Sequence, residues 1–398
     1  MVVSDTPVNE ATTLHEYDAD FHIHVGRALG KPVKIAAGAS LTLENLLHHA
    51  AFVKGLDIIT VIDGVCDNVL VEVDRLTRVG ELASVAGGGL MYRDRMLVLL
   101  GAEVELAGPS GNAAHFGCWF ADYEHARDFN QWLKTVQKNT QLSSQRAWTD
   151  ALTLQTETHA REGLFIVHHA FTPFKGLLGS CVRRVGDFLD LGRVDALELG
   201  LSSDTEMADR LSELSRLTFV TNSDAHGVAN IAREYNRVQM AALNFREVAK
   251  VLNRVDGRGI AANYGLHPEQ GKYYRTRCRA CDEFVQAGGC RCGTTLHHVY
   301  GVKDRLEDIC DLPDAVHPAH RPPYFHHIPL LDIPGLGPGA YRKLLAAYGT
   351  ELAVRRTADE SGLVDVVGER LGRSIARALN GDIHWEVGGA GTYGKVIL

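Results

Sequence analysis

Asp20-Phe21-His22-Ile23-His24, or DFHIH, is the stretch that decides how the rest of the chain is interpreted. Successive side chains of a β-strand point to opposite faces, so His22 and His24 project from the same face. Two neutral imidazoles at the end of a strand can bind one metal ion, and imidazole suits zinc, manganese or iron. The pair predicts a metal site only if distant segments bring further ligands to the same place.

A repeating order of strands and helices follows the DFHIH stretch. One helix is expected from Thr42, its N-cap, to Gly55, and another from Glu124 to about Lys138. A further helix is expected in the stretch that follows, up to Arg161. Apolar runs predict strands at 58–62, 95–101, 113–119, 163–167, 194–197 and 217–221. The alternation predicts parallel β/α units from about residue 17 to residue 263, in which active sites form at the carboxyl ends of the strands.

Histidine, aspartate and glutamate side chains follow the predicted strands at those carboxyl ends. The set is His22, His24, Asp63, Glu103, His115, His169, Glu198, Asp224 and His226. Carboxylates and imidazoles crowded together in a protein interior are costly to desolvate unless a cation compensates them. The set therefore predicts a multinuclear metal site, with two divalent ions bridged by a glutamate.

Length and composition limit the class of protein. A chain of 398 residues is expected to form two or three domains, and we predict boundaries at 1–265, 270–300 and 311–398. The hydrophobic fraction of 45% and the charged fraction of 23% are those of a globular protein, and no apolar run reaches transmembrane length. Because Met1–Glu10 has no signal-peptide pattern, a cytoplasmic location without membrane contact is expected. The net charge of -8 argues against a general nucleic-acid coat.

Four cysteines are clustered in the predicted second domain. They form two short motifs, Cys278-x2-Cys281 and Cys290-x-Cys292. Paired spacing of this kind predicts a small zinc ribbon with one structural, tetrahedral zinc, for which His297 or His298 is an alternative ligand. Neighbouring basic residues, including Arg275 and Arg277, suit contact with phosphate; a solvated charged face is the alternative interpretation.

The order of the strand-end residues resembles that of the PHP (polymerase and histidinol phosphatase) superfamily of metallophosphoesterases. That resemblance implies an α/β fold, a distorted (β/α)7 barrel that holds two or three ions. The longer motifs 165–180 (FIVHHAFTPFKGLLGS), 196–204 (ALELGLSSD) and 221–226 (TNSDAH) resemble the endonuclease Q enzymes, which are PHP-domain DNA-repair nucleases. The resemblance covers nearly the whole chain, including the cysteine cluster and the C-terminal helical segment.

The resemblance also implies roles for single residues. It assigns His22, His24, Glu103 and Asp224 to a first ion, with Glu103 bridging, and His115 and His169 to a second. His226 is implied at a third. The implied catalytic set is His22, His24, Glu103, Asp224 and His226, and the implied ions are zinc, manganese or magnesium.

Two assignments stay open, because Glu105 competes with Glu103 and His168 competes with His169. The chain departs from the family pattern at Asp63-Gly64, where many members have Asp-His, and the loop after His24 lacks a further histidine. Two well-held ions are therefore expected, and the third site stays open.

The C-terminal segment resembles a helix-hairpin-helix DNA-binding motif. Its apolar-x-Gly-x-Gly pattern places Gly335 and Gly337 before a helix that carries Arg342 and Lys343. In such motifs the glycines let backbone N–H groups at a helix N-terminus approach a DNA phosphate. A plain Gly/Pro turn is the alternative interpretation.

The implied activity is incision of DNA, duplex or single-stranded, on the 5′ side of a damaged nucleotide. The implied lesions are deaminated bases (uracil, hypoxanthine, xanthine) and abasic sites, and the products are a 5′-phosphate and a 3′-hydroxyl. Reaching a base in a duplex requires flipping it out, and the candidate pocket residues are Phe171, Thr172, Phe174 and Lys175. Two alternatives stay open: a PHP phosphatase of small phosphomonoesters, and a non-catalytic DNA-binding protein with a decayed barrel.

Overall fold

The computed structural model describes residues 13–285, 289–294, 296–382 and 384–397. The stretch Met1–Glu10, which carries the prediction about a signal peptide, lies outside the described residues. No helix within the described ranges is long and apolar enough to cross a membrane.

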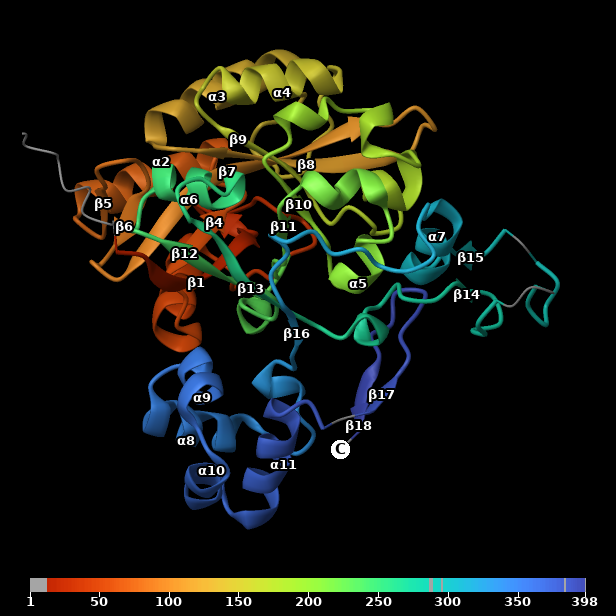
Figure 1. The fold of residues 1–398 in the computed structure, drawn as a ribbon. Helices are drawn as coiled ribbons and strands as arrows, with labels where there is room; N and C mark the ends of the chain where they lie inside the picture. Colours follow the sequence, from red (N-terminus) through yellow and green to blue (C-terminus); the bar gives the residue numbers. More distant parts are fainter. Residues whose placement is uncertain (1–12, 286–288, 295, 383, 398) are drawn as a thin grey trace, which may run out of the picture.

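A 12-stranded mixed sheet forms the centre of the molecule (Figure 1). Its main path runs β11-β10-β9-β8-β7-β4-β1-β12-β13-β16, and a β5-β6 hairpin is added beside β7. The strands are β1 (His15–Ile23), β4 (Ile58–Val61), β5 (Leu82–Ser84), β6 (Leu90–Tyr92), β7 (Met96–Ala107), β8 (Ala113–Phe120), β9 (Leu164–Val167), β10 (Ala196–Glu198), β11 (Phe219–Val220), β12 (Tyr235–Met240), β13 (Gly259–Gly265) and β16 (Tyr324–His326).

The sheet curls into a half-barrel. Beyond β11 the chain returns to β1, where Ile23 and Ala225 form a parallel bridge and the His24 N–H donates to the Ala225 carbonyl at 3.1 Å. The expected α/β fold class is thereby confirmed. Several strands differ from the all-parallel prediction. β12 runs antiparallel to β1 and β13, β6 runs antiparallel to β5 and β7, and β8 runs antiparallel to β7 and β9. The connection over residues 108–112 is too short for the crossover that parallel strands need.

Helices cover the outside of the curled sheet (Figure 1). They are α1 (Leu43–His48), α2 (Asp67–Arg78), α3 (Tyr123–Val136), α4 (Ala151–His159), α5 (Thr205–Ala208) and α6 (Phe245–Asn253). The Thr42 side chain accepts a hydrogen bond from the Asn45 N–H and caps α1, as predicted. A π-helical turn, His49–Lys54, continues α1 to Gly55, whose φ of 89° permits the left-handed end of the helix.

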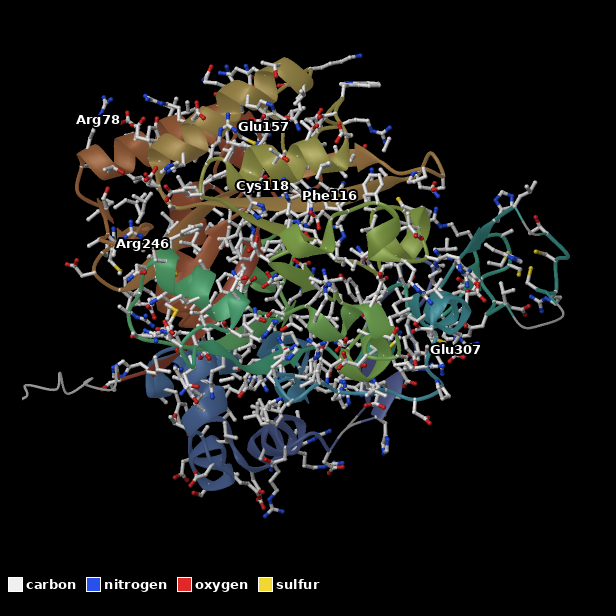
Figure 2. The ribbon with its side chains drawn as sticks, turned by 45° about the horizontal axis from the view of Figure 1, so that its top comes forward. Arg78, Phe116, Cys118, Glu157, Arg246 and Glu307 are labelled. Carbon is white, nitrogen blue, oxygen red and sulfur yellow. The ribbon has the colours of Figure 1, made fainter. Side chains whose placement is uncertain are left out.

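The core lies on both faces of the sheet. One large cluster packs α1–α4 against one face, and a second cluster packs α6 against the other. On β8, Phe116 and Cys118 are fully buried, whereas Arg78 and Glu157 lie at the outer edge of the helical layer (Figure 2). Burial on both faces explains why β7 reads as an unbroken apolar run at its start.

Two smaller regions follow the main sheet. The cysteine-rich segment forms the short ribbon β14 (Arg277–Cys278) and β15 (His298–Val299), followed by α7 (Val302–Ile309). The C-terminal region holds α8 (Pro338–Tyr348), α9 (Glu351–Thr357), α10 (Glu360–Val367), α11 (Glu369–Leu379), β17 (His384–Glu386) and β18 (Lys395–Ile397). Its helices surround a core of their own below the half-barrel (Figure 1).

The half-barrel and the C-terminal helices are joined by a buried ion pair. Lys54, at the end of the π-helical turn, lies 2.6 Å from Glu351 at the start of α9, and both side chains are less than a tenth exposed. The Tyr341 hydroxyl donates to the same carboxylate at 2.8 Å, and the Leu330 N–H donates at 3.2 Å. Both oxygens of the Glu351 carboxylate thus have hydrogen-bond partners, and these bonds fix the helical region against the half-barrel.

We predict that Glu351→Gln lowers the free energy of unfolding by about 3–5 kcal/mol, because it leaves the Lys54 ammonium buried without a counter-charge. Urea denaturation followed by circular dichroism measures the change. The exposed Glu360, changed to Gln, is the matched control and should have little effect. Equal stability of the two variants would show that the buried pair does not hold the regions together.

Candidate metal centre

The carboxyl edge of the half-barrel brings together residues from five strands or the loops that follow them. Three groups of side chains each bring their ligand atoms within 4.8 Å of one another. The groups are His22–His24–Asp224, Glu103–His115–His169 and His22–Glu103–His168. The groups overlap, because Glu103 and His22 each belong to two of them. An arrangement of imidazole and carboxylate donors that shares a glutamate is what a two-ion site requires.

Glu103 occupies the middle of this arrangement. Its Oε1 atom lies 3.0 Å from His115 Nδ1, 3.2 Å from His169 Nε2 and 3.4 Å from His168 Nδ1. His22 Nε2 is 3.5 Å from the same oxygen. The other oxygen faces the His24 side of the site, with His24 Nε2 at 3.7 Å. Each oxygen of Glu103 therefore faces a different ligand group, which is the geometry expected of a bridging carboxylate.

Asp63 and Glu198 lie behind the two histidines of β1. Glu198 Oε2 is 2.9 Å from His22 Nδ1, and Asp63 Oδ1 is 3.1 Å from His24 Nδ1. Neither carboxylate belongs to a ligand group within the described part of the chain. A carboxylate on Nδ1 fixes the ring and its tautomer and leaves Nε2 free for a metal ion. The structure thus places these two predicted ligands as supports for His22 and His24.

Asp224 completes the first group from the loop after β11. Its Oδ1 atom lies 3.3 Å from His24 Nε2 and 3.6 Å from His22 Nε2. The backbone at Asp224 is left-handed, with φ at 44°. Arg233 holds this loop, because its guanidinium donates to the carbonyls of Ser223 at 2.7 Å and Asp224 at 3.3 Å. Strained backbone held by its surroundings is common at functional sites.

His226 lies at the margin of the first group. Its Nδ1 is 2.9 Å from the Asp224 carbonyl, which can only accept, so Nδ1 carries the proton. The ring centroid is 4.7 Å from that of His24. His226 belongs to none of the three ligand groups in the described residues, so its assignment to a third ion stays a prediction.

The structure bears differently on the two pairs of alternative ligands, His168 or His169 and Glu103 or Glu105. His168 and His169 both contact Glu103 and both join a ligand group, so the structure brings the two together. Glu105, by contrast, is in no ligand group among the described residues. Its carboxylate accepts hydrogen bonds from Arg146 Nε at 2.9 Å and from the Lys175 ammonium. Of the two glutamates, Glu103 has the central position.

The charges of the site favour bound cations. Burial lowers the pKa of His22, but the surrounding carboxylates, Glu198 first, outweigh burial and raise that pKa to about 10. Burial raises the pKa of Glu198, yet the charge of His22 lowers it to about 2. The buried His115 Nδ1, which lies 3.0 Å from Glu103 Oε1, has no hydrogen-bond partner among the described residues and is therefore available to a metal ion. This donor set fits zinc, manganese or a similar divalent ion.

The ligand groups open into a pocket of about 350 Å³. Three predicted pocket residues, Thr172, Phe174 and Lys175, line it. The fourth does not: Phe171 is 1% exposed and packs in the main core, so it presents no face to a base. Phe174 is 49% exposed, and its ring lies edge-on to that of Tyr273, with centroids 6.2 Å apart.

Sequence reasoning missed several residues of this pocket. Lys34, Asn222 and Tyr273 line it, and so does Lys272, which the sequence places only among the basic residues around the cysteine cluster. Asn222 follows a predicted strand and could have been found by its strand-end position. Lys34 lies in a Gly/Ala-rich loop that carries no periodic signal, and only its position after the DFHIH stretch could have drawn attention to it.

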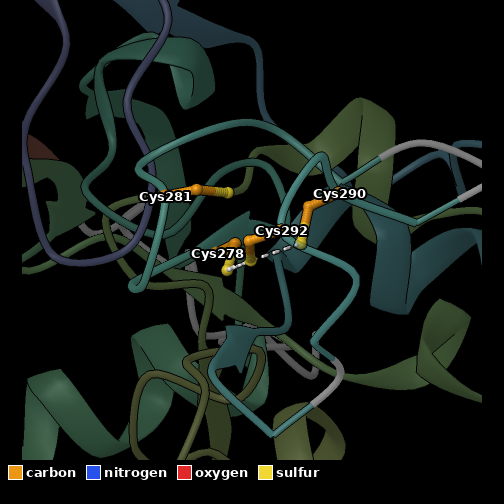
Figure 3. A group of neighbouring side chains, drawn as sticks. All are labelled: Cys278, Cys281, Cys290 and Cys292. Atoms are coloured by element: carbon orange, nitrogen blue, oxygen red, sulfur yellow. Dashed lines mark hydrogen bonds between the residues drawn. The ribbon is translucent and has the colours of Figure 1, made fainter.

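The four cysteines of the second region meet as predicted (Figure 3). Cys278 Sγ lies 3.6 Å from Cys292 Sγ, and Cys290 Sγ lies 3.3 Å from Cys292 Sγ. His298 Nε2 is 3.3 Å from Cys290 Sγ. Four sulfur atoms within 4.8 Å of one another fit a single tetrahedral zinc ion.

The predicted DNA-binding residues fall into two places. Arg275 and Arg277 pair with Asp304 and Asp282 beside the cysteine ribbon. Gly335 and Gly337 form the turn before α8, where φ of Gly335 is 87° and Gly337 is the N-cap of the helix. Arg342 and Lys343 are exposed on α8. The turn, the helix N-terminus and the exposed cations therefore lie on one short segment, as the helix-hairpin-helix pattern requires.

Relatives of the chain are found by sequence, although no protein-family model matches it. It is 39% identical over 383 residues to YqxK of Bacillus subtilis, described as uncharacterized, and the match covers 95% of this chain and 98% of YqxK. MJ0043 of Methanocaldococcus jannaschii, also described as uncharacterized, is 32% identical over 261 residues, which are 58% of this chain and 31% of MJ0043.

Solved structures of endonuclease Q superpose on nearly the whole chain. PfuEndoQ from Pyrococcus furiosus, described as a lesion-specific endonuclease, gives a TM-score of 0.83 at 25% identity and covers 96% of both chains. A complex of endonuclease Q with a 27-mer duplex that has an abasic lesion at the active site gives the same TM-score at 24% identity, covering 96% of this chain and 97% of that one.

Fold and site together define a PHP-superfamily protein of the endonuclease Q type. The chain belongs to the same family as YqxK of Bacillus subtilis. The resemblance inferred from the sequence motifs is thereby confirmed.

We predict that Glu103→Gln loses most of its bound metal, because an amide cannot bridge two cations as a carboxylate does. Glu105→Gln, two residues away on the same face of β7, should keep it. Metal per chain is measured by inductively coupled plasma mass spectrometry after dialysis against dilute Mn²⁺. Loss of metal in Glu105→Gln alone would assign the bridging role to Glu105.

A second prediction concerns the cysteine cluster. Cys278→Ser should lose one equivalent of tightly bound zinc, since a thiolate ligand is removed from a four-coordinate site. Cys310→Ser, at a cysteine outside the cluster, should lose none. Zinc released on denaturation in the presence of a colorimetric chelator gives the count. Equal zinc in both variants would contradict a zinc site built from the four clustered cysteines.

Proposed function

We propose that the protein is a metal-dependent DNA endonuclease of DNA repair, which hydrolyses the phosphodiester on the 5′ side of a deaminated base or an abasic site. The observation that carries the proposal is the position of Glu103, which faces two ligand groups at the floor of an open pocket. The likeness to PfuEndoQ, a lesion-specific endonuclease, supports it over 96% of both chains.

Two divalent ions held by these groups would activate a water molecule and neutralise charge on the phosphodiester during in-line attack. Zinc, manganese and magnesium are the candidates. The chain's own residues supply the positioning. Glu198 and Asp63 orient the two histidines of β1 through their Nδ1 atoms. His226 donates its Nδ1–H to the Asp224 carbonyl. This tautomer leaves Nε2 as a proton acceptor at the margin of the site.

The pocket has room for a flipped nucleotide. Its volume of about 350 Å³ is walled by Thr172, Phe174, Lys175 and Tyr273. An exposed aromatic ring beside the reacting groups can stack on a base or fill the space of a missing one, which suits both deaminated and abasic nucleotides. Lys175 adds a positive charge at the pocket wall, although it also contacts Glu105.

The other two regions suit contact with the DNA backbone. The glycine turn before α8 exposes a helix N-terminus, and Arg342 and Lys343 follow it on the surface. A phosphatase of small molecules would have no use for such a segment or for a cysteine ribbon beside its active site. DNA, duplex or single-stranded, is therefore the proposed partner, with cytoplasmic location and no membrane contact.

The test is a nicking assay on end-labelled duplexes that contain deoxyuridine, deoxyinosine, deoxyxanthosine, an abasic site or no lesion. Mn²⁺, Zn²⁺ and Mg²⁺ are added separately. We expect nicks on the 5′ side of the lesion that leave a 5′-phosphate and a 3′-hydroxyl. Asp224→Ala should lower the rate of nicking by about 10³-fold or more, since it removes the carboxylate that lies beside both β1 histidines in the first ligand group.

The matched control is Asp304→Ala, which removes a partly exposed carboxylate beside the cysteine ribbon and should leave the chemical step intact. Release of phosphate from small monoesters without any nicking would identify a phosphatase instead. Tight DNA binding without turnover under every ion would identify a non-catalytic DNA-binding protein.

A further inference from the structure

The ammonium of Lys34 lies inside the candidate metal centre. Its Nζ is 2.9 Å from Glu103 Oε2, and it donates a further hydrogen bond to Ser144, which itself donates to the same oxygen. The Lys34 side chain is only 13% exposed, although lysine is normally a surface residue. A lysine held this deep in a cluster of ligands needs a specific reason.

The backbone around Lys34 is tied to the strand that carries the metal ligands. The Lys34 N–H donates to the Val25 carbonyl at 3.0 Å, one residue after His24. The preceding Val33 N–H donates to Gly26 at 2.9 Å, beside the ribbon of β2 (Arg27–Ala28) and β3 (Lys31–Pro32). This ribbon folds the loop back over the site, so the position of the ammonium is fixed by the fold.

The surroundings of the ammonium are those of a cation site. The Glu103 carboxylate supplies negative charge in direct contact with it, and the Asp224 carboxylate lines the same pocket. His24 Nε2 faces the same Glu103 oxygen at 3.7 Å, and His226 lines the same pocket as Lys34. A third divalent ion held by His226 on the Lys34 side of the pocket would therefore lie next to a positive charge, and like charges close together repel strongly.

We propose that the Lys34 ammonium is the third cation of this centre, so that the protein binds two metal ions and uses Lys34 to contact a non-bridging oxygen of the scissile phosphate. The inference rests on the proposed function for its substrate and on the geometry for its place. Lys34 shares the pocket with Asp224 and His226, where a phosphodiester must lie to reach the ligand groups. Unlike an ion, the ammonium cannot dissociate, and it stabilises negative charge that grows on the phosphate during attack.

The first readout is the number of ions, which needs no DNA. Full-length wild-type protein, stripped by chelator and reloaded with Mn²⁺, should bind two ions per chain in addition to the zinc of the cysteine ribbon. Lys34→Met and Lys34→Gln should also bind two. A third Mn²⁺ in the wild type, or fewer than two in both variants, would overturn the proposal, because Lys34 would then be a spectator or only a support of Glu103.

The second readout is the rate of nicking. Lys34→Met should lower kcat by about 10²-fold and change KM little, since the contact strengthens in the transition state. Lys34→Arg should recover part of kcat. Lys31→Met, an exposed lysine of the same ribbon, is the control and should behave as wild type. Unchanged kcat in Lys34→Met would overturn the proposal, whereas a wild type that nicks no DNA but binds two ions would overturn the proposed function and leave the ion count standing.

Discussion

The arrangement of the whole site depends on the buried carboxylate of Glu103. The Glu103 side chain is 1% exposed and faces four imidazoles through one oxygen and an ammonium through the other. A protein interior tolerates such a concentration of charge only when opposite charges and hydrogen bonds compensate it closely. The curled sheet provides that compensation, because the ends of β1, β9 and β11, the start of β8 and the middle of β7 bring their side chains together at one edge.

The layers behind this point serve the same purpose. Asp63 and Glu198 orient the β1 histidines, and Arg233 holds the backbone of the Asp224 loop. Further out, the Lys54–Glu351 pair attaches the helical region to the half-barrel. The region proposed to bind the DNA backbone is thereby held at a fixed position relative to the centre proposed to cut it, which an endonuclease needs if incision is to occur at a defined distance from the lesion.

Much of the fold could be predicted because buried strands and strand-end polar residues leave a periodic signal. The DFHIH stretch and Asp224 were found this way, whereas the cysteine motifs were found by their paired spacing, and the structure brings each to the expected place. The reversed direction of β8 was not predicted, since direction depends on the length of a connection and not on periodicity. For Phe171 and Phe174 the sequence left open whether they line the pocket or only pack the barrel mouth, because the local pattern does not show that one is buried and the other exposed. Lys34 was missed because an irregular loop carries no pattern.

If two metal ions bind, Glu103 is placed to contact both of them, beside the ammonium of Lys34. Anomalous diffraction from crystals of the full chain grown with Mn²⁺ tests it most directly. The geometry predicts two manganese peaks in the half-barrel, one among His22, His24 and Asp224 and the other toward His115 and His169, each within bonding distance of Glu103. A single peak, or a peak at the position of the Lys34 ammonium, would contradict it.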